Sequence, residues 1–142
     1  MLVNKGYDIL ADIPGYLNPA NLFINQRPDI VVCFKNLVYA IELTICFETN
    51  FNKSRTYKEE RYENLKENMK DSNKELKLYF LEFSSLGFSS PNMIEFTRWL
   101  RPLGVDVHRM VSVSTEVCIR TSYYIFNRRN KDWTDPVLLK YN

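Results

Sequence analysis

The sequence predicts a small α/β domain in which a mixed sheet, an antiparallel hairpin plus a crossover strand, is flanked by helices on both faces. Two adjoining runs, residues 28–34 and 37–46, are rich in Val, Ile, Phe, Tyr and Thr and predict two strands. A helical pattern over residues 52–71 then precedes another apolar run at 75–83. Because strand, crossover helix and strand make a βαβ unit, the last strand should run parallel to its neighbour.

The N-terminal part predicts one further strand and a tight hairpin. The stretch GYDILADIPG indicates a strand over residues 7–12 that ends at a proline and a glycine, and residues 16–26 read as a loop. Lys35 and Asn36 separate the two central strands. Asn tolerates the positive φ that a two-residue hairpin turn needs, so the turn is expected at this pair.

The helix expected over residues 52–71 has Asn50 or Asn52 as its N-cap. Side chains three and four positions apart share one face of a helix, and this face should lie against the sheet. Its members are Arg55, Lys58, Tyr62, Leu65 and Met69.

Two more helices are expected in the C-terminal third. Ser90 followed by Pro91 is typical of a helix start, a cap and then a proline in the first turn. This helix should end near Gly104. Asp106 then caps a last helix that runs to about Arg128.

Composition limits the class of protein. The 142 residues, of which 45% are hydrophobic, are enough for one globular domain, so we expect residues 1–142 to form a single domain, whole or as a fragment of a longer protein. No apolar run is long enough to span a membrane. The three cysteines show no metal-binding spacing, and their odd number predicts a reducing, intracellular setting.

Several catalytic classes are excluded. The one histidine, His108, has no partner near it in the sequence, which argues against a catalytic triad. No glycine-rich phosphate loop occurs, which argues against nucleotide hydrolysis of that kind. The net charge of +2 is small, but Arg128, Arg129 and Lys131 form a basic cluster.

Two carboxylates should meet across the hairpin. If the chain turns at Lys35–Asn36, Asp29 lies directly opposite Glu42, with Cβ atoms about 5 Å apart. Like charges in this position destabilise a sheet, so a shared proton, a cationic side chain or a divalent metal must offset them. Alternatively, Asp29 lies at a frayed strand end and is harmless. Lys58 is expected near the pair, either as an ammonium that serves it or as a stem covering the core.

These residues carry a resemblance. Pro28-Asp29, twelve residues and then Glu42-Leu43-Thr44 resemble the PD-(D/E)xK nuclease superfamily. Thr44 stands where the motif lysine usually lies. In a deviation known in that superfamily the lysine has moved to the following helix, where Lys58 matches it.

A narrower group matches as well. Arg27-Pro28-Asp29 with Glu42 looks like the (K/R)PD-x(12–14)-(D/E) signature of the restriction-like endonuclease of site-specific non-LTR retrotransposons. The stretches IELTICFETN…YKEERYENL and RTSYYIFNRRNKDW resemble reverse-transcriptase-associated proteins of invertebrate mobile elements, with Arg61-Tyr62 matching a recurrent pair. The superfamily usually has a helix before its first strand. Here the sequence begins almost at that strand, so either the helix is absent or the chain is a fragment of a longer protein.

The resemblance implies a metal-dependent nuclease that acts on DNA. Asp29 and Glu42 would be catalytic and would hold one or two Mg²⁺ or Mn²⁺ ions, with the backbone carbonyl of Leu43 as another ligand. Lys58 would be the third catalytic residue and would position water or meet developing charge. The residues expected to contact nucleic acid are Thr44, Arg61, Arg120, Arg128, Arg129 and Lys131.

Two functions therefore stay open. The first is an endonuclease that nicks target DNA for a mobile element. The second is a nuclease-like fold without activity that serves as a DNA-binding or protein-interaction module. Beyond DNA, a reverse transcriptase domain or a second copy of the chain is the partner considered, and no membrane is expected.

Overall fold

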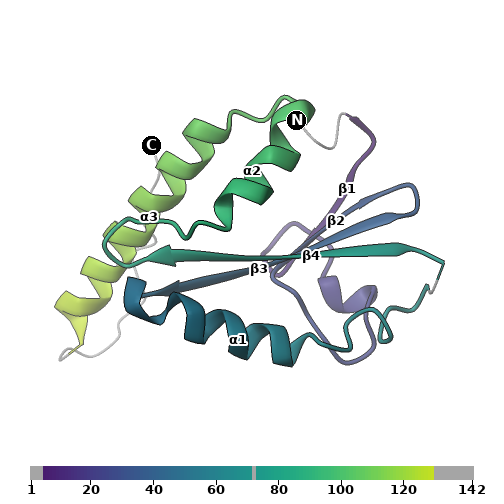
Figure 1. Cartoon of the computed structure of the whole chain (residues 1–142), viewed down its shortest axis with the longest axis horizontal. Coiled ribbons are helices and arrows are strands. Elements are labelled where there is room, and N and C mark those ends of the chain that lie inside the picture. Colours follow the sequence, from purple (N-terminus) through teal and green to yellow (C-terminus); the bar gives the residue numbers. More distant parts are fainter. Residues whose placement is uncertain (1–4, 72, 130–142) are drawn as a thin grey trace.

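The computed structural model describes residues 5–71 and 73–129 (Figure 1). Its four-stranded sheet has the order β1-β2-β3-β4, and the strands are β1 (Asp8–Ala11), β2 (Ile30–Phe34), β3 (Leu37–Cys46) and β4 (Glu75–Ser84). β1 and β2 are antiparallel, as are β2 and β3, whereas β3 and β4 are parallel. The mixed sheet follows from the chain order, because a crossover helix returns β4 in the direction of β3.

Helices cover both faces of the sheet, as the sequence predicts. α1 (Phe51–Arg61) lies on one face, and α2 (Met93–Leu100) and α3 (Val107–Arg128) lie on the other (Figure 1). Short 3₁₀ turns are η2 (Pro19–Asn21), η3 (Glu48–Asn50) and η4 (Arg101–Leu103). One apolar cluster lies between the sheet and α2 and α3, and a second lies between the sheet and the segments before β2 and after α1. No helix in the described part of the chain has the length and apolar character to cross a membrane.

The hairpin turns where it was expected. Phe34 pairs with Leu37, so Lys35 and Asn36 make a two-residue turn. The left-handed backbone conformation falls on Lys35, with φ of 53°, and not on Asn36 as the sequence suggested. The aliphatic stem of Lys35 lets its ammonium lie 5.3 Å from the ring centre of Phe34, which is one contact that holds this turn.

α1 ends earlier than predicted, at Arg61 and not at residue 71. The apolar residues expected on its inner face are nevertheless buried, in turns that follow the helix. These residues are Tyr62, Leu65 and Met69.

Tertiary hydrogen bonds explain why residues 68–70 do not continue the helix. The Lys70 N–H donates to the carbonyl of Leu22 at 3.0 Å, and the carbonyl of Asn68 accepts from the Ile24 N–H at 2.9 Å. Backbone groups that pair with residues 22–24 cannot also continue a helical ladder. The chain therefore exchanges helix for a short antiparallel contact with the loop before β2.

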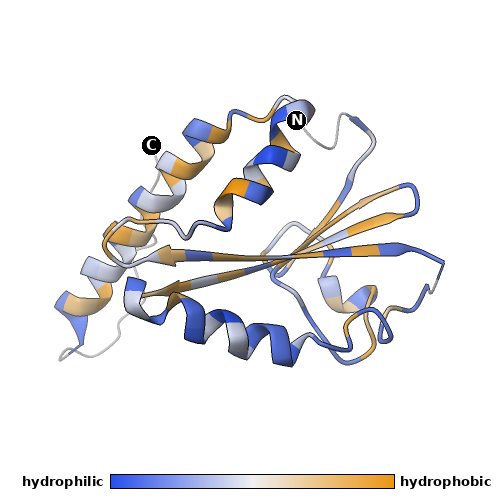
Figure 2. Ribbon diagram, in the orientation of Figure 1, coloured by the Kyte–Doolittle hydropathy of each residue, from blue (hydrophilic) through white to orange (hydrophobic). Residues whose placement is uncertain are grey.

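α1 is bound to the sheet in an unusual way for a covering helix. Figure 2 shows it as a hydrophilic ribbon, and none of its residues is buried. An amphipathic helix would instead bury an apolar stripe. Polar contacts from Arg55 and Lys58 must therefore hold α1 in place, and both are described below.

The C-terminal helices begin at different signals. Asp106 caps α3 as predicted, because its Oδ1 accepts from the Arg109 N–H at 2.9 Å. Ser90 does not cap α2, which begins at Met93. The Ser90 hydroxyl donates instead to the carboxylate of Glu82 at 2.5 Å, because that buried acid lies within its reach.

Candidate active site

The structure places Asp29 directly opposite Glu42, as the turn predicts. Ile30 pairs with Ile41, so the next position on each strand brings the two acids together. The Asp29 N–H donates to Glu42 Oε1 at 3.1 Å, and the Leu43 N–H donates to Asp29 Oδ2 at 2.8 Å. Asp29 is half-buried, and both its backbone N–H and its side chain are hydrogen-bonded to β3, so it is not a frayed end.

Lys58 supplies the positive charge that accommodates the two acids. Glu42 is only 1% exposed, and its Oε2 is in direct contact with the Lys58 ammonium, whose side chain is 19% exposed. An ammonium beside a buried carboxylate offsets both its desolvation and its repulsion of Asp29. The cationic side chain, one of the three expected ways to stabilise the pair, is therefore observed.

Tyr62 is a second partner of Glu42 that the sequence did not assign to the site. It is 3% exposed and its hydroxyl donates to Glu42 Oε1 at 2.6 Å. Burial, and next the hydrogen bond to Glu42, raise the pKa of the Tyr62 phenol above its ordinary value. Its position in the helical repeat predicted burial, but that pattern does not say what the hydroxyl meets.

We expect Tyr62→Phe to destabilise the fold by about 2 kcal/mol at pH 7, because a buried charged acceptor loses a donor. In the unfolded chain tyrosine ionises near pH 10, whereas the folded chain keeps the proton to higher pH. Unfolding then releases a proton above about pH 10, so the stability that Tyr62 contributes is full below that pH and falls above it.

Urea melts between pH 7 and 11 check this expectation. The stability gap between wild type and Tyr62→Phe should shrink above about pH 10. Tyr123→Phe is the matched control, since Tyr123 is 69% exposed and should show no such gap. A gap that is constant over the whole pH range would contradict the assigned hydrogen bond.

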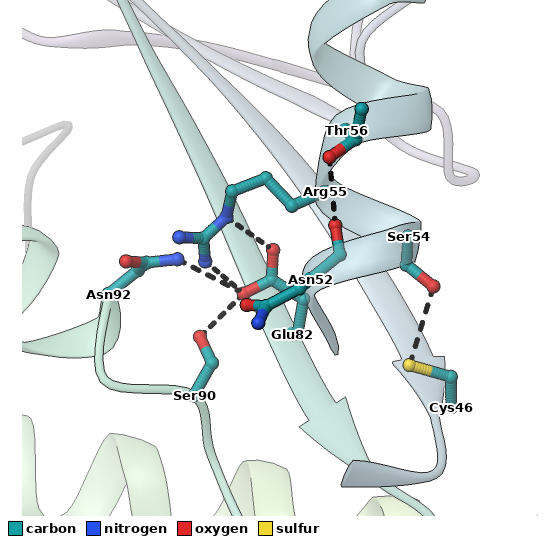
Figure 3. A network of polar contacts seen from close by, with 8 residues as sticks. All are labelled: Cys46, Asn52, Ser54, Arg55, Thr56, Glu82, Ser90 and Asn92. Atoms are coloured by element: carbon teal, nitrogen blue, oxygen red, sulfur yellow. Dashed lines mark hydrogen bonds and ion pairs between the residues drawn. The ribbon is translucent and has the colours of Figure 1, made fainter. Parts of the chain in front are cut away.

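A second buried carboxylate lies on the same face, at a position that the sequence motifs do not mark. Glu82 on β4 is 1% exposed and is aligned with Thr44 on β3. Arg55 binds it with two bonds, Nε to Oε1 at 3.1 Å and Nη2 to Oε2 at 2.6 Å (Figure 3). Ser90 and Asn92 also donate to Oε2, at 2.5 and 3.4 Å.

The two carboxylates explain how a polar helix covers the sheet. Arg55 and Lys58 are three positions apart on α1 and therefore share one face. Arg55 reaches Glu82 on β4 and Lys58 reaches Glu42 on β3. Each ion pair joins a cation of α1 to an acid on a different strand. Together the two ion pairs fix the position of α1 over the sheet and its rotation about its own axis.

An exposed ion pair borders the site. Arg27 Nη2 lies 3.2 Å from Asp12 Oδ2, and the Asp12 N–H donates to the carbonyl of Asp29 at 3.2 Å. Both side chains are well exposed, so this pair contributes little stability. It brings the arginine of the Arg-Pro-Asp stretch to the edge of the carboxylate site.

The predicted nucleic-acid contacts divide into two groups. Thr44 lies on the same face of the sheet as Glu42. Arg61 is exposed at the C-terminal end of α1, and its guanidinium lies 5.5 Å from the Tyr62 ring centre. Arg120 and Arg128 lie on α3, which covers the opposite face of the sheet, and Arg129 directly follows this helix (Figure 1). Lys131 lies outside the described residues.

The basic residues of α3 have contacts of their own. Arg120 forms an exposed ion pair with Glu116 at 2.6 Å. The guanidinium of Arg128 lies 5.1 Å from the Tyr124 ring centre, and that of Arg129 lies 4.2 Å from the Phe126 ring centre. Arg128 and Arg129 are therefore held at the end of α3, and none of the three lies in the carboxylate site.

The acids retain some capacity to bind a hard cation. No cluster of three or more His, Cys, Asp or Glu side chains suited to a metal occurs among the described residues. Among the described residues, Asp29 Oδ1 accepts no hydrogen bond. Each carboxylate oxygen has two lone pairs, so Glu42 Oε2 keeps one lone pair free beside its contact with Lys58. Mg²⁺ commonly uses one or two carboxylates and completes its shell with water and substrate phosphate, so this donor set fits a weakly held ion.

Comparison of the chain with protein-family models, with curated proteins and with solved structures finds no match. The nuclease resemblance therefore depends on the residues themselves and on the geometry described above.

Proposed function

We propose that this protein is a metal-dependent endonuclease with a restriction-endonuclease-like fold, which hydrolyses DNA phosphodiester bonds and nicks target DNA for a mobile element. The observation that carries the proposal is the pairing of Asp29 with Glu42 across the hairpin, with Lys58 on the Glu42 carboxylate. Two acids on neighbouring strands, with a lysine from the helix that covers them, form an arrangement suited to phosphoryl transfer.

In this proposal Asp29, Glu42 and the Leu43 carbonyl would hold Mg²⁺ or Mn²⁺. When bound, the ion would polarise the phosphodiester and lower the pKa of a bound water. The Tyr62 hydroxyl and the Asp29 N–H hold the Glu42 carboxylate in one orientation, because both donate to its Oε1. Lys58 then presents a positive charge where negative charge grows on the phosphate.

A second function is favoured by one specific observation. The carboxylate of Glu42 already receives three donors, from Lys58, Tyr62 and Asp29. A carboxylate so fully engaged is also what a nuclease-like fold without activity would show, if it served only to bind DNA. Cleavage and binding must therefore be measured separately.

The test is nicking of a supercoiled plasmid by the purified chain. We expect open-circular product with Mg²⁺ or Mn²⁺, and binding without turnover in Ca²⁺, because a site of two carboxylates needs a cation to engage phosphate. Full activity in excess EDTA would contradict the proposal. Binding of DNA without nicking in any metal would favour the inactive DNA-binding module.

A further inference from the structure

A groove lies beside the candidate active site. It runs between the C-terminal half of β3 and α1, and has a volume of about 490 Å³. Thr44 lines it from the strand, and Lys53, Tyr57 and Lys58 line it from the helix. Because the Lys58 ammonium also contacts Glu42, the groove opens directly next to the carboxylate pair.

Lys53 and Tyr57 make up the outer wall of this groove. They are four positions apart on α1 and therefore lie on one side of the helix. Tyr57 is 62% exposed, so a large part of its ring is available for contact. Lys53 is exposed and forms no ion pair within residues 5–71 and 73–129, although Arg55 and Lys58 on the same helix are both paired.

An uncovered aromatic ring beside an unpaired cation is the combination that binds single-stranded nucleic acid. Bases stack on aromatic rings with little regard to sequence, and lysines contact the phosphates between them. A base inside a duplex already has a neighbour on each face, so it cannot stack on a protein ring unless it is first unpaired.

We propose that this groove holds an unpaired nucleotide of the DNA strand next to the cleaved bond, with its base on the ring of Tyr57 and its phosphate at the ammonium of Lys53. The inference deepens the proposed function and rests on it for the identity of the ligand. It predicts that the protein acts at single-stranded, bulged or frayed DNA in preference to a closed duplex.

The test separates the base from the phosphate. An oligomer of fifteen thymidylates and an abasic oligomer of the same length carry the same charge, and only the first has bases to stack. Binding of both is measured by fluorescence anisotropy in EDTA, with Asp29→Asn as the background so that no cleavage interferes. The variants compared are Tyr57→Ala, Tyr57→Phe, Lys53→Gln and Lys66→Gln.

We expect the thymidylate oligomer to bind roughly 5- to 150-fold more tightly than the abasic one, which is the effect of stacking one base. Tyr57→Ala should lower this ratio at least about fivefold, and Tyr57→Phe should keep it, because phenylalanine retains the ring. Lys53→Gln should weaken both oligomers alike and reduce the salt slope of log K by about 0.7, as expected for one phosphate contact on a single strand. Lys66→Gln, at an exposed lysine beyond α1, should leave both values unchanged.

The outcomes distinguish this inference from the proposed function. If Tyr57→Ala and Lys53→Gln bind like their background while wild type nicks plasmid, the groove assignment is wrong and the nuclease stands. If the variants shift binding as expected but no metal supports nicking, the groove stands and catalysis does not. An equal loss on a closed fifteen-base-pair duplex upon Tyr57→Ala would overturn the preference for an unpaired base.

Discussion

Replacing Asp29 with asparagine should lower metal-dependent nicking by at least about 100-fold while leaving the fold intact. A bound metal contributes several kcal/mol to the transition state, and each 1.36 kcal/mol is a factor of ten in rate. An asparagine oxygen can still accept from the Leu43 N–H, which is the contact that Asp29 Oδ2 makes now. The variant therefore removes a charge and a metal ligand without removing the hydrogen bond to β3.

The measurement is the plasmid nicking rate in Mn²⁺ together with a thermal melt in EDTA. Glu60→Gln is the matched control, because Glu60 is an exposed acid on α1 and its loss should change neither value. If Asp29→Asn nicks at the wild-type rate, the nuclease assignment fails at this site.

Lys58→Ala gives the complementary result. It should reduce nicking by about 10²–10³-fold, the usual effect of losing one electrostatic stabiliser. Unlike Asp29→Asn, it should also destabilise the metal-free fold by about 3 kcal/mol, because the buried Glu42 carboxylate loses its ammonium. If both variants slow nicking but only Lys58→Ala lowers the stability of the metal-free fold, Asp29 acts as a metal ligand and Lys58 as the counter-charge of Glu42.

Glu82→Gln should destabilise the protein by about 3 kcal/mol, the low end of the range for breaking a buried ion pair. The low end applies because a quarter of the Arg55 side chain is exposed and the guanidinium can recover some hydration. The amide of glutamine cannot serve all four donors that now meet this carboxylate. For a domain of this size the melting temperature should fall by roughly 10 °C.

The chain offers a control for this variant. Glu116→Gln breaks the ion pair with Arg120, whose two side chains are more than half exposed, and should change stability by less than about 0.5 kcal/mol. Replacing both Glu82 and Arg55 by Leu should recover much of the loss, because an apolar pair has no unpaired charge. If Glu82→Gln melts like Glu116→Gln, the buried pair does not hold α1.

Local signals in the sequence were sufficient for the strands and for the position of Asp29. A two-residue turn at Lys35–Asn36 fixes the register of the hairpin, and register alone places Asp29 opposite Glu42. Lys58 could be placed near them because helical spacing turns it toward the sheet. These inferences succeed because the contacts are set by residues close together in the chain.

The partners of the second acid could not be inferred in this way. Glu82 interrupts an apolar strand just as Glu42 does, so its burial could have been suspected from the same pattern. That Arg55 pairs with it depends on the parallel register that aligns Glu82 with Thr44, and a crossover connection leaves that register free until α1 docks.

Tertiary contacts also decided that residues 68–70 leave the helical pattern and which group the Tyr62 hydroxyl contacts. The pattern from Tyr62 to Met69 reads as helix, but the backbone of residues 68–70 bonds to residues 22–24 instead. Tyr62 remains buried, and its hydroxyl meets Glu42. The sequence by itself determined that two acids would share one end of a hairpin. Only the tertiary structure decided that the Tyr62 hydroxyl joins Lys58 on Glu42 and that Arg55 meets Glu82, because these contacts join segments whose approach no local pattern encodes.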